Sequence, residues 1–161
     1  MKYRKAKTIQ KIKTFKEAVE ATEEIKNCYQ NGLKALGNYS NKIQLGDTKK
    51  CEGSVDIDEC VKAKYPQDNR WDYVFSYKGE VFFVEVHSAY TNEVSVILKK
   101  LQWLKDWLNR EAPEIKSLKA KGQAFYWIQS NGYHILPKSS QSRLLAQEGL
   151  KIKPIAKLIL K

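Results

Sequence analysis

Cysteine is scarce in this chain, and its spacing argues against two common ways of stabilising a small protein. The three cysteines, Cys28, Cys51 and Cys60, are odd in number and form no Cys-X-X-Cys pair. The two histidines add no cluster that would complete a zinc site. We therefore expect neither a disulfide framework nor a structural zinc ion, and we interpret the cysteines as buried or idle thiols.

Long apolar runs are also missing. No stretch approaches the length of a membrane span, and the opening MKYRKAKTIQKIK lacks the apolar centre of a signal peptide. The chain contains no Gly-rich phosphate loop, no Gly-X-Ser-X-Gly elbow and no His-Glu-X-X-His pair. We expect a cytoplasmic protein without membrane contacts, in which residues 1–161 form a single domain.

Charge is unevenly distributed along the sequence. The formal net charge of +11 divides into +7 over residues 1–50, −3 over residues 51–100 and +7 over residues 101–161. Basic flanks attract a polyanion, whereas an acidic centre attracts a divalent cation. The profile favours a protein that acts on nucleic acid, and the alternative is that the basic charge serves only solubility.

The most informative stretch is Trp71–His87, WDYVFSYKGEVFFVEVH. Its β-branched and aromatic residues predict two strands, joined by a tight turn at Lys78-Gly79. Asp72 opens the first strand, and Glu85 lies inside the apolar run of the second strand. Because side chains alternate between faces, Glu85 and His87 share one face of that strand.

A carboxylate inside so apolar a run is costly to bury. The ordinary interpretation is that Glu85 and His87 point to solvent. Two acids and an imidazole on adjacent strands also suit a hard divalent cation such as Mg²⁺ or Mn²⁺, which is commonly held by one or two carboxylates with water and phosphate oxygens.

Further elements follow from periodicity and capping. A capping box at Thr14–Glu17 predicts a long helix that reaches Leu36, and a second helix with an apolar stripe is predicted over Thr91–Arg110. In the second helix, Trp103 and Trp107 are interpreted as residues of the core or of a homodimer interface.

Shorter elements lie between and after these helices. Asp56, Asp58 and Glu59 are expected in the first turn of a short helix, with Asp56 and Glu59 as metal ligands in the alternative reading. Strands are predicted at 123–128 and 133–136, joined by a hairpin turn at Asn131-Gly132. This order predicts an α/β fold with a mixed central sheet flanked by helices, and parallel strands on either side of the second helix.

At the Trp71–His87 hairpin, the chain resembles the PD-(D/E)XK, or restriction-endonuclease-like, nuclease superfamily. Asp72 matches the motif Asp and Glu85 matches the motif Glu, while His87 stands where the family usually has Lys and Trp71 where it has Pro. The resemblance extends over residues 9–136. It implies a single nuclease-like domain with an αβββαβ core.

The resemblance also implies further site residues. The family often supplies an extra acidic group from an N-terminal helix, for which Glu20 and Glu24 are the candidates. A missing strand Lys is sometimes replaced by a group from the following helix, and the candidates are Lys99, Lys100 and Gln102.

The leading hypothesis is an enzyme, a metal-dependent phosphodiesterase that cleaves nucleic acid and, by the resemblance, DNA. Asp72 and Glu85 would hold Mg²⁺ or Mn²⁺, and His87 would orient or deprotonate the attacking water. The alternative is a catalytically inactive nuclease-like module that binds nucleic acid or protein. A third reading is an accessory protein with a partner interface at Trp71, Trp103 and Trp107.

Overall fold

The computed structural model describes residues 14–147 and 152–161. The α-helices and 3₁₀ segments are α1 (Phe15–Glu20), η1 (Lys34–Lys42), η2 (Thr48–Lys50), α2 (Ile57–Val61), η3 (Thr91–Glu93), α3 (Val94–Arg110), α4 (Pro113–Ser117) and α5 (Ser140–Gln147). The strands are β1 (Gln30–Asn31), β2 (Ile43–Leu45), β3 (Gly53–Asp56), β4 (Tyr73–Tyr77), β5 (Glu80–Tyr90), β6 (Phe125–His134) and β7 (Leu158–Leu160).

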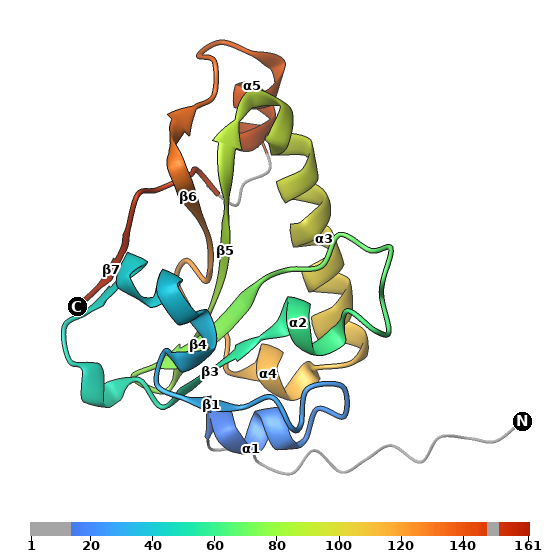
Figure 1. Cartoon of the computed structure of the whole chain (residues 1–161), viewed down its shortest axis with the longest axis vertical. Coiled ribbons are helices and arrows are strands. Elements are labelled where there is room, and N and C mark those ends of the chain that lie inside the picture. Colours follow the sequence, from blue (N-terminus) through green and yellow to red (C-terminus); the bar gives the residue numbers. More distant parts are fainter. Residues whose placement is uncertain (1–13, 148–151) are drawn as a thin grey trace, which may run out of the picture.

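The architecture is mixed α/β. A five-stranded sheet has the order β1-β3-β4-β5-β6, in which β5 and β6 are parallel and the other neighbours are antiparallel. The strands β2 and β7 form a separate parallel pair. Helix α3 runs alongside β5, whereas α1, α2 and α4 lie toward the other end of the molecule from α5 (Figure 1). The predicted mixed sheet flanked by helices is therefore confirmed.

The central hairpin forms as its sequence predicts. Strands β4 and β5 pair in a register that sets Tyr73 opposite Val84 and Tyr77 opposite Glu80. The turn between them has positive φ at Lys78 (51°) and Gly79 (77°), as a tight hairpin turn requires. This register also brings Asp72, one residue before β4, beside Glu85.

Helix α3 connects β5 to β6 and packs on the sheet through its apolar stripe. The stripe residues that are buried are Val94, Ile97, Leu101, Leu104 and Leu108. Trp107 is fully buried in the core, and the half-buried Trp103 stacks on it with ring centroids 5.8 Å apart. The core interpretation is confirmed for Trp107, and the homodimer stays a prediction.

The expected long N-terminal helix is wrong. Thr14 caps α1 as predicted, since its Oγ1 accepts a hydrogen bond from the Glu17 amide at 3.1 Å. The helix ends at Glu20, however, and the chain then pairs with the sheet at Gln30 and Asn31. Tertiary pairing outweighs the weak local preference for helix over so short a segment.

The expected hairpin at Asn131-Gly132 is also wrong. Residues on both sides of this dipeptide belong to one strand, β6, which stays parallel to β5 through the pairing of Tyr133 with Ala89. Gly132 has φ of 96°, and the register shifts between His87 and Ala89. The glycine therefore accommodates an irregularity within a strand and does not reverse the chain.

The cysteines depart from expectation as well. Cys28 and Cys60 form a disulfide with a Cα–Cα distance of 6.3 Å, and only Cys51 is a buried free thiol within the described ranges. Their 32-residue separation in the sequence concealed a proximity that the fold creates. In residues 14–147 and 152–161, no helix combines the length and apolar character needed to cross a membrane.

Candidate functional site

Asp72 and Glu85 are locked together by reciprocal hydrogen bonds to backbone amides. The Asp72 amide donates to Oε2 of Glu85 at 2.9 Å, and the Val86 amide donates to Oδ2 of Asp72 at 3.1 Å. Each carboxylate therefore fixes the strand that carries the other. This arrangement is a direct result of the β4–β5 register.

Burial makes this pair unusual. The side chain of Glu85 has no exposed surface, and that of Asp72 is 20% exposed. Glu85 lies opposite Trp127 of β6, and Trp127 is itself fully buried. Burying a carboxylate in such surroundings costs several kcal/mol, on the order of 5, unless it is paired with a cation.

That cation is Lys100 of α3. Its ammonium group donates a hydrogen bond to Oε1 of Glu85 and lies 3.7 Å from Oδ1 of Asp72. The Lys100 side chain is only 15% exposed. One nitrogen therefore lies within ion-pair distance of both carboxylates.

The pKa values of the three groups follow from this geometry. Burial, together with the negative charge of Asp72, raises the pKa of Glu85 well above its ordinary value, although Lys100 opposes the shift. Burial also raises the pKa of Asp72 against the opposing charge of Lys100. For Lys100, burial lowers the pKa, but Glu85 and Asp72 outweigh it and the pKa is raised. Two carboxylates and one ammonium leave the cluster short of positive charge.

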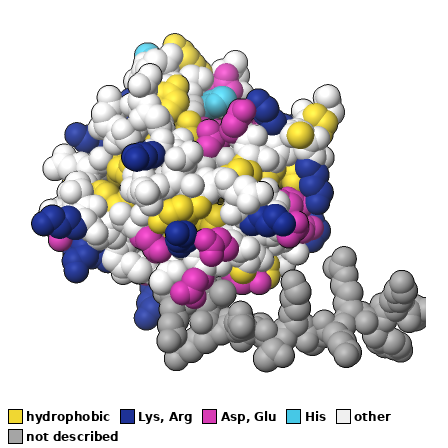
Figure 2. Space-filling view, turned by 60° about the horizontal axis from the view of Figure 1, so that its bottom comes forward, with side chains coloured by type: hydrophobic (Ala, Val, Ile, Leu, Met, Phe, Trp, Pro, Cys, Tyr) yellow, Lys and Arg dark blue, Asp and Glu magenta, His cyan; other side chains and the backbone are white. Residues whose placement is uncertain are grey.

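His87 stands beside this cluster and is held by a residue that the sequence did not single out for the site. Its Nε2 lies 2.9 Å from Oε2 of Glu93, and its Nδ1 lies 4.0 Å from Oε1 of Glu85. If Nε2–H donates to the Glu93 carboxylate, the lone pair of Nδ1 is on the side that faces Glu85. Figure 2 shows acidic side chains gathered beside a histidine on one face of the molecule.

The remaining candidates from the sequence lie outside this cluster. Lys99 is exposed, and Gln102 donates to Oδ1 of Asp106 at 3.0 Å. Glu20 is exposed at the end of α1. Glu24 accepts hydrogen bonds at both carboxylate oxygens, from Lys64, Tyr65 and Trp107.

The acids at the start of the short helix α2 form a helix cap and an ion pair. Asp56 is the N-cap and not, as expected, a residue of the first turn, and its Oδ1 accepts a hydrogen bond from the Glu59 amide at 2.9 Å. Asp58 pairs with Arg70 at 2.8 Å and contributes to the raised pKa of Asp72. This pair therefore borders the site without contacting Glu85 directly.

Glu93 and Arg70 are the residues near the site that sequence reasoning missed. Glu93 reaches His87 because η3 turns the chain back after β5, and the six-residue spacing matches no regular element. No signal in the sequence distinguishes it from an ordinary acid at a helix start.

Within the described residues, no group of three or more His, Cys, Asp and Glu side chains is arranged to hold a metal ion. A metal at this site would thus have Asp72 and Glu85 as its protein ligands and take the rest from water or substrate. Comparison of the chain with family models, with curated proteins and with solved structures finds no match in any of the three.

Proposed function

We propose that this protein is a metal-dependent nuclease with a restriction-endonuclease-like core, and that Asp72, Glu85 and Lys100 form its active site. The order of its elements supports the proposal. The antiparallel strands β3, β4 and β5, then helix α3 and the parallel strand β6, occur in the order that the resemblance implies, with α2 inserted between β3 and β4 and α4 inserted before β6.

The observation that carries the proposal is the position of Lys100. The family pattern calls for a lysine two residues after Glu85, where this chain has His87. The ammonium group of Lys100 comes from α3 instead and meets both carboxylates. A lysine brought to the acidic pair from another element would supply the charge that the motif lacks.

The donor set fits a hard divalent cation. Both acids present carboxylate oxygens, which are the ligands that Mg²⁺ and Mn²⁺ prefer, and the cluster is short of positive charge. Asp72 and Glu85 would hold the ion. When bound, it would activate water for attack and neutralise charge that develops on the scissile phosphate.

Lys100 would stabilise negative charge on the phosphate, and His87 would accept a proton from the attacking water. The Lys100 ammonium can hold the attacking water or donate to a phosphate oxygen in the transition state, where such a donor contributes about 3 kcal/mol. The His87 ring, oriented by Glu93, offers Nδ1 as a proton acceptor on the side of the acidic pair.

The distribution of charge supports nucleic acid as the substrate, and the resemblance implies that this nucleic acid is DNA. Residues 51–100 carry the acidic pair and a net charge of −3, whereas both flanks carry +7. Lysine and arginine side chains are spread over the surface around the acidic group in Figure 2. Such charges attract phosphates and release counterions on binding.

A second candidate function is a nuclease-like module that binds nucleic acid without cleaving it. The observation in its favour is that Lys100 already neutralises one carboxylate. In residues 14–147 and 152–161, no buried side-chain nitrogen or oxygen lacks a hydrogen-bond partner. The hydrogen bonds of the buried side chains at the site are therefore satisfied without any metal.

The two functions separate in one experiment. Supercoiled plasmid is incubated with the protein in Mn²⁺, in Mg²⁺ and in EDTA, with Asp72→Asn and Glu85→Gln as matched variants. The nuclease proposal expects metal-dependent nicking that falls by about a hundredfold or more in either variant. Nicking that persists in both variants would come from elsewhere and overturns the proposal.

The binding module gives a different pattern. It expects no nicking with either metal, together with binding of a fluorescent duplex in EDTA. That affinity should fall by about a factor of ten or more between 50 and 200 mM salt. An affinity that does not change with salt would contradict an extended phosphate-binding surface.

A further inference from the structure

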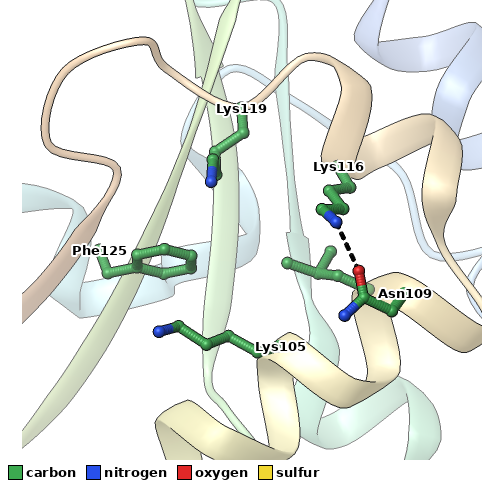
Figure 3. A pocket seen from close by; sticks show the side chains of 6 residues that line it. Lys105, Asn109, Lys116, Lys119 and Phe125 are labelled. Atoms are coloured by element: carbon green, nitrogen blue, oxygen red, sulfur yellow. Dashed lines mark hydrogen bonds between the residues drawn. The ribbon is translucent and has the colours of Figure 1, made fainter. Parts of the chain in front are cut away.

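A cavity beside α3 is lined by three lysines and three other residues. It has a volume of about 260 Å³ and is bounded by Lys105, Leu108, Asn109, Lys116, Lys119 and Phe125. These residues, which we call the lysine pocket, come from α3, from α4 with the loop after it, and from the start of β6. Figure 3 shows their side chains around the opening.

The lysine pocket is separate from the acidic site. Lys100 points to Glu85 and Asp72, whereas the Lys105 ammonium lies 5.8 Å from the ring centroid of Phe125. Five residues along an α-helix turn a side chain by about 140°, so α3 stands between the two sites. A ligand in the pocket therefore does not occupy the carboxylate pair.

Positive charge in the pocket has no counterpart. The ammonium groups of Lys105 and Lys119 lie 5.8 and 5.7 Å from the centroid of the same Phe125 ring. In the described part of the chain, no carboxylate lies within ion-pair distance of Lys105, Lys116 or Lys119. Figure 3 shows the Phe125 ring between the Lys105 and Lys119 ammonium groups, with Lys116 on another side of the same cavity. An anion inside the cavity would supply the negative charge that these lysines lack.

The polar groups around the cavity are almost all donors. Lys116 donates to Oδ1 of Asn109 at 2.6 Å, which occupies an acceptor oxygen of the pocket. The Nδ2 amide of Asn109 and the lysine ammonium groups remain to donate to a ligand. Leu108 and Phe125 provide an apolar wall beside them.

We propose that the lysine pocket binds a phosphomonoester group, carried either by a small molecule or by the end of a nucleic-acid strand. Such a group has a charge of about −1.5 to −2 at neutral pH and three acceptor oxygens, which matches three ammonium donors. A carboxylate or an internal phosphodiester carries only one negative charge and matches them less well. The apolar wall suits the carbon portion next to the phosphate.

This proposal does not rest on the proposed nuclease activity, and its test avoids that activity. Binding is measured by calorimetry in EDTA with three probes: inorganic phosphate, a thymidine dinucleotide with a 5′-phosphate, and the same dinucleotide with a 5′-hydroxyl. The variants are Lys105→Ala and Lys119→Ala, with circular dichroism as a check on folding. Lys121→Ala is the matched control, because Lys121 is exposed in the same loop and lies outside the pocket.

The proposal expects the 5′-phosphorylated dinucleotide to bind about tenfold more tightly than the 5′-hydroxyl form. Lys105→Ala and Lys119→Ala should each weaken binding by about tenfold, and Lys121→Ala by less than about twofold. Inorganic phosphate that binds as tightly as the phosphorylated dinucleotide identifies a small-molecule site. Binding of the dinucleotide alone identifies strand ends.

Two results overturn the proposal. The first is equal binding of the phosphorylated and hydroxyl dinucleotides. The second is a loss in Lys121→Ala as large as in Lys105→Ala and Lys119→Ala, since binding would then reflect the overall charge of the surface.

Discussion

Lys100 donates a hydrogen bond to Oε1 of Glu85, so helix α3 supplies a cation to a carboxylate that is buried in the sheet. The strand position two residues after Glu85, where the nuclease pattern has lysine, is occupied by His87. His87 is bonded to Glu93 and stands 4.0 Å from Glu85. In the proposed nuclease, the role of the motif lysine would be divided between Lys100 of α3 and His87 of β5.

Replacing Lys100 with Met should abolish metal-dependent cleavage and lower the free energy of unfolding by about 3 kcal/mol. The reason is that Glu85 would remain buried without its cation. Urea denaturation at pH 7 and the plasmid assay measure the two effects. Lys99→Met is the matched control, because Lys99 is exposed on the same helix and should tolerate the change. Equal behaviour of the two variants would contradict the assignment.

A double-mutant cycle isolates the ion pair. Glu85→Gln in the Lys100→Met background removes the unpaired charge, so part of the lost stability should return. The coupling free energy between the two positions should be about 1–3 kcal/mol. A coupling near zero would mean that Lys100 stabilises the protein through the packing of its alkyl chain.

His87 is expected to contribute through proton transfer. His87→Ala should lower the cleavage rate by about a hundredfold or more while leaving the thermal unfolding temperature nearly unchanged, because the ring is partly exposed. Glu93→Gln keeps a hydrogen-bond partner for the ring and should lower the rate less, by about tenfold. His87→Lys should keep or raise activity. An unchanged cleavage rate in His87→Ala would show that the imidazole takes no part in cleavage.

Glu24 should make the protein sensitive to acid. Burial raises the pKa of Glu24, but hydrogen bonds from Lys64, Trp107 and Tyr65 outweigh it and hold the pKa below the ordinary value of 4.5. A lowered pKa stabilises the fold above the unfolded-state pKa, and this contribution is lost as the pH falls through the folded-state pKa.

The matched variant for this effect is Glu24→Gln, which removes the titrating group and keeps an acceptor oxygen for Trp107. The free energy of unfolding, measured by urea denaturation at pH 6 and pH 3, should fall more for the native protein than for Glu24→Gln. Parallel decreases in the two proteins would exclude Glu24 as a source of acid sensitivity.

The Cys28–Cys60 disulfide should stabilise the fold by about 3–4 kcal/mol, since it closes a loop between residues 32 apart in the sequence. Cys28→Ser/Cys60→Ser and the reduced native protein should unfold at the same urea concentration. Alkylation after denaturation without reductant should modify one thiol, that of Cys51, and three after reduction. Three reactive thiols without reductant would contradict the pairing and fit a reducing cytoplasm, the location that the sequence predicted.

Within the folded protein, Cys51 should react slowly. Burial, together with the charge of Glu52, raises the pKa of its thiol to about 11, so little thiolate is present at pH 8. Alkylation of the native protein should accelerate when urea unfolds it. A fast reaction in the native state would mean that Cys51 is accessible.

The sequence by itself determined the parts that depend on short-range rules. Alternating apolar residues and the Lys78-Gly79 turn were sufficient to predict the hairpin, and its period placed Glu85 and His87 on one face. The apolar stripe of α3 was equally clear, because a helix must bury one side against the sheet. These features also identified Asp72 and Glu85 as the acidic pair.

The tertiary structure decided everything that depends on contacts between distant residues. Lys99, Lys100 and Gln102 were equivalent in the sequence, and only the rotation of α3, set by the packing of its stripe, directs Lys100 to Glu85. Contacts between distant elements likewise brought Cys28 to Cys60 and kept β6 parallel to β5. Local preferences near each of these sites are worth about 1 kcal/mol or less per residue, so the burial and pairing of whole elements outweigh them.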